Sequence, residues 1–281
     1  MSIEQERLTK KLWDAALCGD VAALAQCLAD GADVNACREN GESPLHMAAH
    51  NGNIEGVKLL LAARPAPKMN AQDNRGATPL NISARSPYDP GEVATALIEA
   101  GADFTIKNIY GMTALHDAAR FRNVNVLKAI LAKGADVNLG ADEGMQTPLH
   151  IAANYSQTNT TITLLEAGAD IHAKRQESRT ALFDAAQWGN TTILDILLAA
   201  SAPVTEEIIQ GTLSRGHYRN AEYLQSIMNG TTPRPTPEQV GLDMAKRNAA
   251  LGIAKKPILG KHTSAAEHQR QAALDDPEQG I

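Results

Sequence analysis

Aromatic residues are scarce in this sequence. Tryptophan, tyrosine and phenylalanine make up only 4% of the 281 residues, whereas apolar residues as a whole make up 43%. Alanine and leucine must therefore fill most of any core. That composition suits closely stacked helices better than a β-sandwich, which relies on β-branched and aromatic side chains.

The sequence also lacks an excess of positive charge. Lysine and arginine number 26 against 32 aspartates and glutamates, which gives a formal net charge of −6. This balance argues against a general nucleic-acid binder, because phosphate contacts need concentrated basic residues. No apolar run approaches the roughly 20 residues of a membrane span, and residues 1–12 contain no apolar signal-peptide core. We expect a cytoplasmic protein.

Signatures of chemistry are missing as well. The three cysteines, Cys18, Cys27 and Cys37, do not have the spacing of C-x-x-C metal knuckles, and we expect free thiols in a reducing compartment. There is no Gly-rich phosphate loop, no G-x-S-x-G and no H-E-x-x-H. We therefore predict that the protein is not an enzyme and has no metal site and no cofactor.

What the sequence does contain is a repeat. A phrase of seven residues recurs five times, with first residues 35, 35, 34 and 33 positions apart. The copies are Ser-Pro-Leu-His-Met-Ala-Ala at 43–49, Thr-Pro-Leu-Asn-Ile-Ser-Ala at 78–84, Thr-Ala-Leu-His-Asp-Ala-Ala at 113–119, Thr-Pro-Leu-His-Ile-Ala-Ala at 147–153 and Thr-Ala-Leu-Phe-Asp-Ala-Ala at 180–186. A half-copy lies at 12–16, and Gly-Ala-Asp keeps step at Gly31, Gly101, Gly134 and Gly168.

Each position in the repeat has a physical reason. Thr or Ser caps a helix, and Pro is well tolerated at the first helical position. The alanine pair allows close helix approach, a second amphipathic helix follows, and Gly suits the left-handed position after it. The unit is turn, helix, loop, helix, and copies must stack because one unit cannot bury its own apolar face.

Over about residues 7–230 the sequence closely resembles the ankyrin-repeat family, through Thr-Pro-Leu-His-x-Ala-Ala and Gly-Ala-Asp-Val-Asn. We predict an all-α ankyrin-repeat solenoid of about six helix pairs with short β-turn fingers, followed by a flexible C-terminal tail. The expected ankyrin-repeat domain is 1–230, with repeats near 7–39, 40–73, 74–107, 108–140, 141–174 and 175–204 and a degenerate cap at 205–230.

The resemblance also decides how the recurring histidines and aspartates are interpreted. It implies that His46, His116 and His150 form structural hydrogen bonds between neighbouring repeats. Stacking would also separate them by about 10 Å, too far to share one metal ion. Asp14 and Asp117 recur beside the alanine pair, as does Asp184, and we assign them to the scaffold or its surface.

Beyond residue 230 the repeat stops at a Pro/Thr-rich stretch, 231–237. We predict that 231–281 is mostly disordered. It could be a solvated linker, a docking segment that folds on a partner, or a nucleic-acid or membrane contact. Two short helices, near 240–250 and from Ser264, and a basic patch between them are expected.

The resemblance implies that residues after the alanine pair line a concave groove and that the turns form its rim. Aromatic residues, Met and Arg dominate interface hot spots. Phe121, Tyr155 and Trp188 share one matching site with Asn51, and they either form a contiguous apolar strip or simply pack on one another over the helix ends. The predicted partner-binding residues are Ile109, Tyr110, Met112, Arg120, Phe121, Met145, Tyr155, Arg179 and Trp188.

The function expected from this sequence is that of a protein-binding scaffold or adaptor that grips a partner protein on the concave face. No nucleic-acid partner and no membrane span are expected, and the tail could add a second docking contact. Three roles stay open: a regulatory or inhibitory subunit acting on a partner enzyme, a chaperone-like holder, and a secreted effector.

Overall fold

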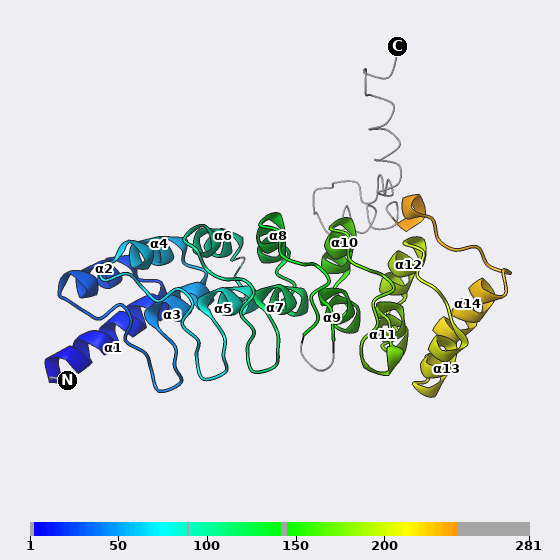
Figure 1. The fold of residues 1–281 in the computed structure, drawn as a ribbon, viewed down its shortest axis with the longest axis horizontal. Coiled ribbons are helices and arrows are strands. Elements are labelled where there is room, and N and C mark those ends of the chain that lie inside the picture. Colours follow the sequence, from blue (N-terminus) through cyan, green and yellow to red (C-terminus); the bar gives the residue numbers. More distant parts are fainter. Residues whose placement is uncertain (1–2, 89, 142–144, 241–281) are drawn as a thin grey trace, which may run out of the picture.

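The computed structural model describes residues 3–88, 90–141 and 145–240. Within them the chain forms helices that pair along one elongated stack (Figure 1). The first helix of each pair belongs to an inner row, which continues from one repeat to the next. The inner helices are α1 (Ile3–Cys18), α3 (Pro44–Asn51), α5 (Pro79–Arg85), α7 (Ala114–Phe121), α9 (Pro148–Asn154), α11 (Ala181–Gln187) and α13 (Glu206–Ser214).

The second helix of each pair forms an outer row, on the side of the inner row that is opposite to the fingers (Figure 1). These helices are α2 (Val21–Ala29), α4 (Ile54–Ala62), α6 (Gly91–Glu99), α8 (Val124–Ala132), α10 (Thr158–Glu166), α12 (Thr191–Ala199) and α14 (Tyr218–Met228). A short 3-10 helix, η1 (Gln176–Ser178), lies in one finger. The described residues contain no strand, and only an isolated bridge joins Ala141 to Gln146. The predicted all-α solenoid is confirmed.

The helix boundaries follow the repeat as expected. Ser43, Thr78, Thr113, Thr147 and Thr180 are the N-cap residues of their inner helices. Gly101 and Gly134, which follow outer helices, have φ angles of +97° and +85°, a region that glycine occupies without a steric cost.

Alanine and leucine build the core. The alanine pairs, such as Ala48 and Ala49 or Ala118 and Ala119, are almost completely buried between successive inner helices. Leucines such as Leu60 and Leu97 fill the layer between the rows. Each repeat therefore buries its apolar face on its neighbours, which is how a solenoid obtains one continuous core.

The packed region extends further than the predicted boundary at residue 230. The Arg234 guanidinium donates a hydrogen bond to the carbonyl of Ala202 at 2.6 Å, and Val240 is buried in the core. Residues 231–240 thus contact the repeats, because Arg234 satisfies a carbonyl at the end of the sixth repeat. The rest of the predicted tail, with its expected helices and basic patch, lies outside the described residues.

No helix among the residues described here is both long and apolar enough to cross a membrane.

Candidate partner-binding surface

Three aromatic rings lie at the same place in three successive repeats. Phe121 is the last residue of α7, and Tyr155 and Trp188 are the residues that end α9 and α11. Their exposed fractions are 44%, 42% and 55%. Because α7 contacts α9 and α9 contacts α11, the rings form one row along the ends of the inner helices. The structure thus places the three rings side by side, and their role in binding a partner stays a prediction.

Arginines lie over these rings. The Cζ of Arg120 is 5.6 Å from the centroid of the Phe121 ring and 5.0 Å from that of the Tyr155 ring. The Cζ of Arg215 is 5.8 Å from the Trp188 ring centroid. These distances are typical of cation–π contacts. Arg120 therefore bridges two neighbouring rings. We call Arg120, Phe121, Tyr155, Trp188 and Arg215 the helix-end strip.

Sequence reasoning missed Arg215. It ends α13 and precedes Gly216, just as Trp188 ends α11 and precedes Gly189. The pair of a C-cap residue and a glycine was the signal that could have found it. The seven-residue phrase cannot be recognised in α13. The end of α13 was therefore not matched with the ends of the earlier inner helices.

The fingers carry a separate group of predicted residues. Ile109, Tyr110 and Met145 are 61%, 61% and 63% exposed, in turns that precede the inner helices. An inner helix of eight residues is about 12 Å long, and so the fingers and the helix-end strip lie at opposite ends of α7. The nine predicted residues therefore fall into two groups, one at each end of the inner helices.

Two of the predicted finger residues turn inward. Met112 is half-buried and packs against the core. Arg179 forms an ion pair with Glu177, and its Cζ lies 4.8 Å from the ring of the buried Phe183. The Met112 and Arg179 side chains therefore help to hold the fingers on the inner helices, and a partner-binding role for them stays a prediction.

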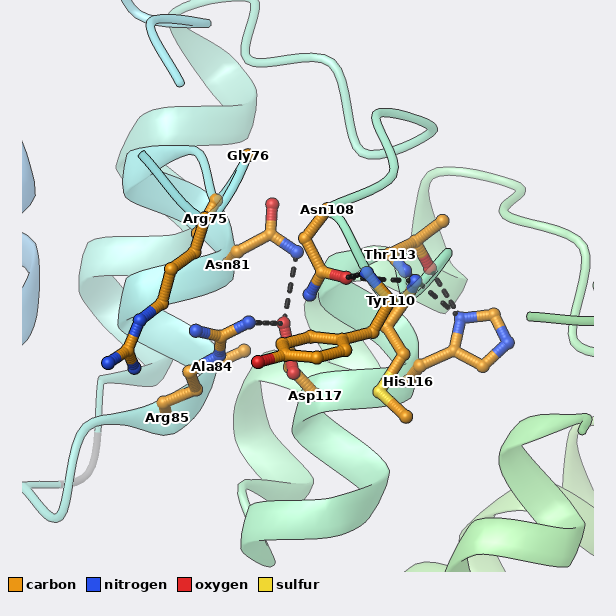
Figure 2. Close-up of polar contacts among 12 residues, drawn as sticks. Arg75, Gly76, Asn81, Ala84, Arg85, Asn108, Tyr110, Thr113, His116 and Asp117 are labelled. Atoms are coloured by element: carbon orange, nitrogen blue, oxygen red, sulfur yellow. Dashed lines mark hydrogen bonds and ion pairs between the residues drawn. The ribbon is translucent and has the colours of Figure 1, made fainter. Parts of the chain in front are cut away.

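A buried polar cluster supports the fourth repeat beneath these surfaces (Figure 2). The Asp117 carboxylate accepts a hydrogen bond from Asn81 Nδ2 at 3.0 Å and pairs with Arg85 at 3.1 Å. Burial raises the pKa of the Asp117 carboxyl above its usual value, while the charge and hydrogen bond of Arg85 act in the opposite direction. Asp184 is also buried and accepts two hydrogen bonds from Arg175. Both aspartates thus belong to the scaffold.

The finger of the fourth repeat is closed by Asn108 (Figure 2). Its Oδ1 accepts hydrogen bonds from the backbone N–H groups of Tyr110 and Met112, at 2.8 and 3.1 Å. Asp73 does the same in the third repeat for Arg75 and Ala77. This side chain therefore fixes the turn that presents Tyr110.

The histidines form the structural bridges that the resemblance implied. In His46 the ring Nδ1 accepts from the Ser43 backbone N–H at 3.2 Å, and Nε2 donates to the Ala77 carbonyl at 3.1 Å. His116 and His150 repeat the pattern toward the carbonyls of Leu139 and Arg179. Burial lowers the pKa of His46 and of His150. Each of these histidine rings therefore links the N-cap of its own inner helix to the finger of the next repeat.

Nothing in the described part of the chain resembles a metal centre. No group of three or more His, Cys, Asp or Glu side chains gathers there in a way that could hold an ion. Cys18, Cys27 and Cys37 are free thiols, and burial raises the pKa of Cys27. Exposed aromatic rings and arginines are residue types that are enriched at protein interfaces.

Comparisons with known proteins agree with this architecture. A family model described as ankyrin repeats (3 copies) matches residues 12–108 and 139–207, and another, ankyrin repeats (many copies), matches 97–152. Human neurogenic locus notch homolog protein 2 is 37% identical over 114 residues, 41% of this chain and 4% of that protein. The probable 26S proteasome regulatory subunit p28 of Saccharomyces cerevisiae is 30% identical over 110 residues, 39% of this chain and 47% of that protein. The chain thus spans less than half the length of these relatives.

Solved structures give longer matches. The ankyrin repeat domain of human ASB11 matches with a TM-score of 0.64 and 25% identity, covering 73% of this chain and 96% of that one. A chain in the solved complex of the predatory endopeptidase Bd0816 from Bdellovibrio bacteriovorus with immunity protein Bd3460 matches with a TM-score of 0.59 and 32% identity. That match covers 67% of this chain and 96% of the other.

Proposed function

The chain belongs to the ankyrin-repeat family, and we propose that it is a scaffold or adaptor that holds a partner protein on the face formed by its inner helices. Ankyrin repeats generally mediate protein–protein interaction, and proteins of this family are typically scaffolds rather than enzymes. In this proposal the helix-end strip is the main contact, and the exposed finger residues Ile109, Tyr110 and Met145 add a second one. The free thiols support a reducing, cytoplasmic location.

One observation carries the proposal. Of the few aromatic residues in the chain, three occupy the same helix-end position in successive repeats, and all three remain about half exposed. Rings held in a row by backbone stacking lose little entropy on binding, and exposed aromatic patches of this kind mark interaction sites. The core does not need them, because alanine and leucine fill it.

The test is a comparison of variants in partner capture. The full chain is used as bait in an affinity pull-down, and the captured protein is identified by mass spectrometry and then purified. The triple variant Phe121→Ala, Tyr155→Ala, Trp188→Ala is expected to weaken its binding by more than about 100-fold, because hot-spot truncations cost about 1–3 kcal/mol each. Its melting temperature should change little, because the rings are half exposed.

The matched control is Ile3→Ala. Ile3 is a large apolar residue that is 80% exposed at the start of α1, in the first repeat. This variant should bind as wild type does. If the triple variant captures the partner as strongly as wild type, the strip is not the binding surface.

A second candidate role is that of a regulatory or inhibitory subunit of a partner enzyme. The match to a chain of an endopeptidase–immunity protein complex, at 32% identity over most of the repeats, favours this candidate. A concave array can cover an active-site mouth without supplying any chemistry of its own.

Enzyme assays distinguish this role from simple scaffolding. If the captured partner is a hydrolase, an equimolar amount of the full chain should suppress its turnover, and the triple ring variant should restore it. Unchanged turnover in a saturated complex would leave the scaffold role and rule out inhibition.

A further inference from the structure

The turns that follow α7, α9, α11 and α13 differ in charge from the rest of the chain. We define them as residues 120–123, 154–157, 187–190 and 214–219. They contain four arginines and no aspartate or glutamate, in a chain whose formal net charge is −6. The arginines are Arg120, Arg122, Arg215 and Arg219. These four turns, which contain the helix-end strip, thus form a basic surface on an acidic protein.

These four arginines differ from the others of the inner row. Arg85 pairs with Asp117, Arg175 with Asp184 and Arg179 with Glu177. Among the described residues, none of the four has a carboxylate oxygen within ion-pair distance. Asp117, Asp184 and Glu177 are thus paired with other arginines, and Asp117 also interacts with the charge of Arg120. Four arginines with one shared carboxylate leave the four turns with a net positive charge.

Stacking on the rings restricts the conformations of two of these arginines. Arg120 and Arg215 lie over Phe121, Tyr155 and Trp188 at 5.0–5.8 Å from the ring centroids. A guanidinium uses its face on an aromatic ring, while its five N–H donors lie in its plane and match a carboxylate. Stacking also restricts the rotamers of the arginine, and so less entropy is lost when an acid binds.

The surface is continuous as far as the last helix pair. His217 packs so closely on Gly189, beside Trp188, that a Cβ on this glycine would lie 2.6 Å from His217 Nδ1. Arg215 and Arg219 therefore flank the Trp188 turn. With inner helices about 10 Å apart, the four turns span roughly 30 Å. An extended peptide of roughly nine residues covers that length.

We propose that the helix-end strip binds an extended acidic segment of a partner protein, in which Asp or Glu residues alternate with apolar ones. The carboxylates pair with Arg120, Arg122, Arg215 and Arg219, and the apolar side chains cover the exposed rings. This inference rests on the proposed function and names the chemistry of the partner at that same surface.

A single-stranded nucleic acid is the competing ligand, because it too uses arginines and stacking rings. The observations favour the peptide. Binding along a phosphate backbone needs a continuous series of cations, but these turns contain no lysine and the chain as a whole is acidic.

The experiment selects ligands without presupposing the partner. A displayed library of random peptides about twelve residues long, enough to cover the strip, is panned on the full chain. Enriched peptides are synthesised with a fluorophore, and their Kd values are measured by anisotropy at low and high salt. We expect enrichment of Asp and Glu together with Leu, Phe or Trp, and weaker binding at high salt.

Two double variants test whether the arginines of the strip bind the acidic peptides. Arg120→Gln with Arg215→Gln should weaken the acidic peptides by about tenfold or more. The control, Arg7→Gln with Arg64→Gln, removes two exposed arginines of the first repeats and should have no effect. Non-acidic enriched peptides, acidic peptides indifferent to the first variant, or tighter binding of an oligothymidylate of similar length would each overturn the inference.

The ring variant separates this inference from the proposed function. If non-acidic peptides are enriched but the Phe121, Tyr155 and Trp188 alanine variant abolishes their binding, the strip binds proteins and only the acidic chemistry is wrong. If the enriched peptides tolerate both the arginine and the ring variants, the strip itself is not a binding surface.

Discussion

The two halves of the inner row use one repeated position in different ways. In repeats two and three the residue at the end of the inner helix is polar and holds the array together: Asn51 Nδ2 donates to the Leu17 carbonyl at 2.9 Å, and Ser86 Oγ donates to the His50 carbonyl at 2.8 Å. In repeats four to six the matching residues are Phe121, Tyr155 and Trp188, which face solvent.

In the fourth and fifth repeats another residue supplies the bridge to the preceding turn. Two positions further on, Asn123 Nδ2 donates to the carbonyls of Ala84 and Ser86, and Gln157 Nε2 donates to that of Arg120. Asn53 already makes such a bond in the second repeat, to the Gly19 carbonyl. Because Asn123 and Gln157 join their turns to the preceding repeat, the helix-end position in these repeats does not have to supply that hydrogen bond. The same helix-end position can therefore stabilise the array in the first half and remain available for recognition in the second half.

The largest effect should come from comparing two aspartates at the same repeat position. Asp117→Ala is expected to lower the free energy of unfolding by about 3 kcal/mol, because it leaves Arg85 and Asn81 without their buried acceptor. Asp14→Ala should cost less than about 0.5 kcal/mol, since the Asp14–Arg38 pair is exposed. Urea unfolding followed by circular dichroism measures both. Equal costs would mean that the two halves are stabilised alike.

The next effect concerns the histidine bridges and pH. Burial lowers the pKa of His46 and His150 from 6.5 in the folded chain, and so the unfolded chain takes up protons first as the pH falls. Their contribution to stability is complete above about pH 6.5 and declines below it, by at most about 1.4 kcal/mol per pH unit for each ring.

The third repeat offers the matched substitution for that measurement, because Asn81 occupies the histidine position there. His46→Asn should keep the helix cap, lose the bond to the Ala77 carbonyl at a cost of about 1–2 kcal/mol, and flatten the acid decline. Subtracting its pH profile from that of wild type removes the opposing contribution of Asp117, whose pKa burial raises. An unchanged slope between pH 7 and pH 5 would contradict the role of His46.

The smallest effect tests the helix-end position itself. Ser86→Ala should lower the free energy of unfolding by about 1 kcal/mol, because the Ser86 hydroxyl is buried and bonded to the His50 carbonyl. Its affinity for the captured partner should be that of wild type. This is the reverse of the profile expected for the ring variants, and a loss of binding on Ser86→Ala would show that recognition extends into the first half.

Much of the fold could be predicted because the residue type at each repeat position meets a requirement of the local backbone or packing. A hydroxyl caps a helix, alanine allows close packing and glycine adopts a positive φ, whichever repeat contains it. Which of Asp14, Asp117 and Asp184 forms a buried ion pair could not be predicted in this way. All three stand beside an alanine pair, but Arg85 and Arg175 reach only the last two inside the stack.

The sequence by itself determined the solenoid, its inner helices and the shared repeat position of the three rings, because these repeat with the period of the chain. The resemblance to a family added the histidine bridges. Only the tertiary structure decided which side chains are presented. It separated the fingers from the helix ends by the length of a helix, turned Met112 and Arg179 inward, and brought Arg215 over Trp188. The physical reason is that stacking fixes where each backbone position lies, whereas the charge and burial of a side chain depend on neighbours from adjacent repeats.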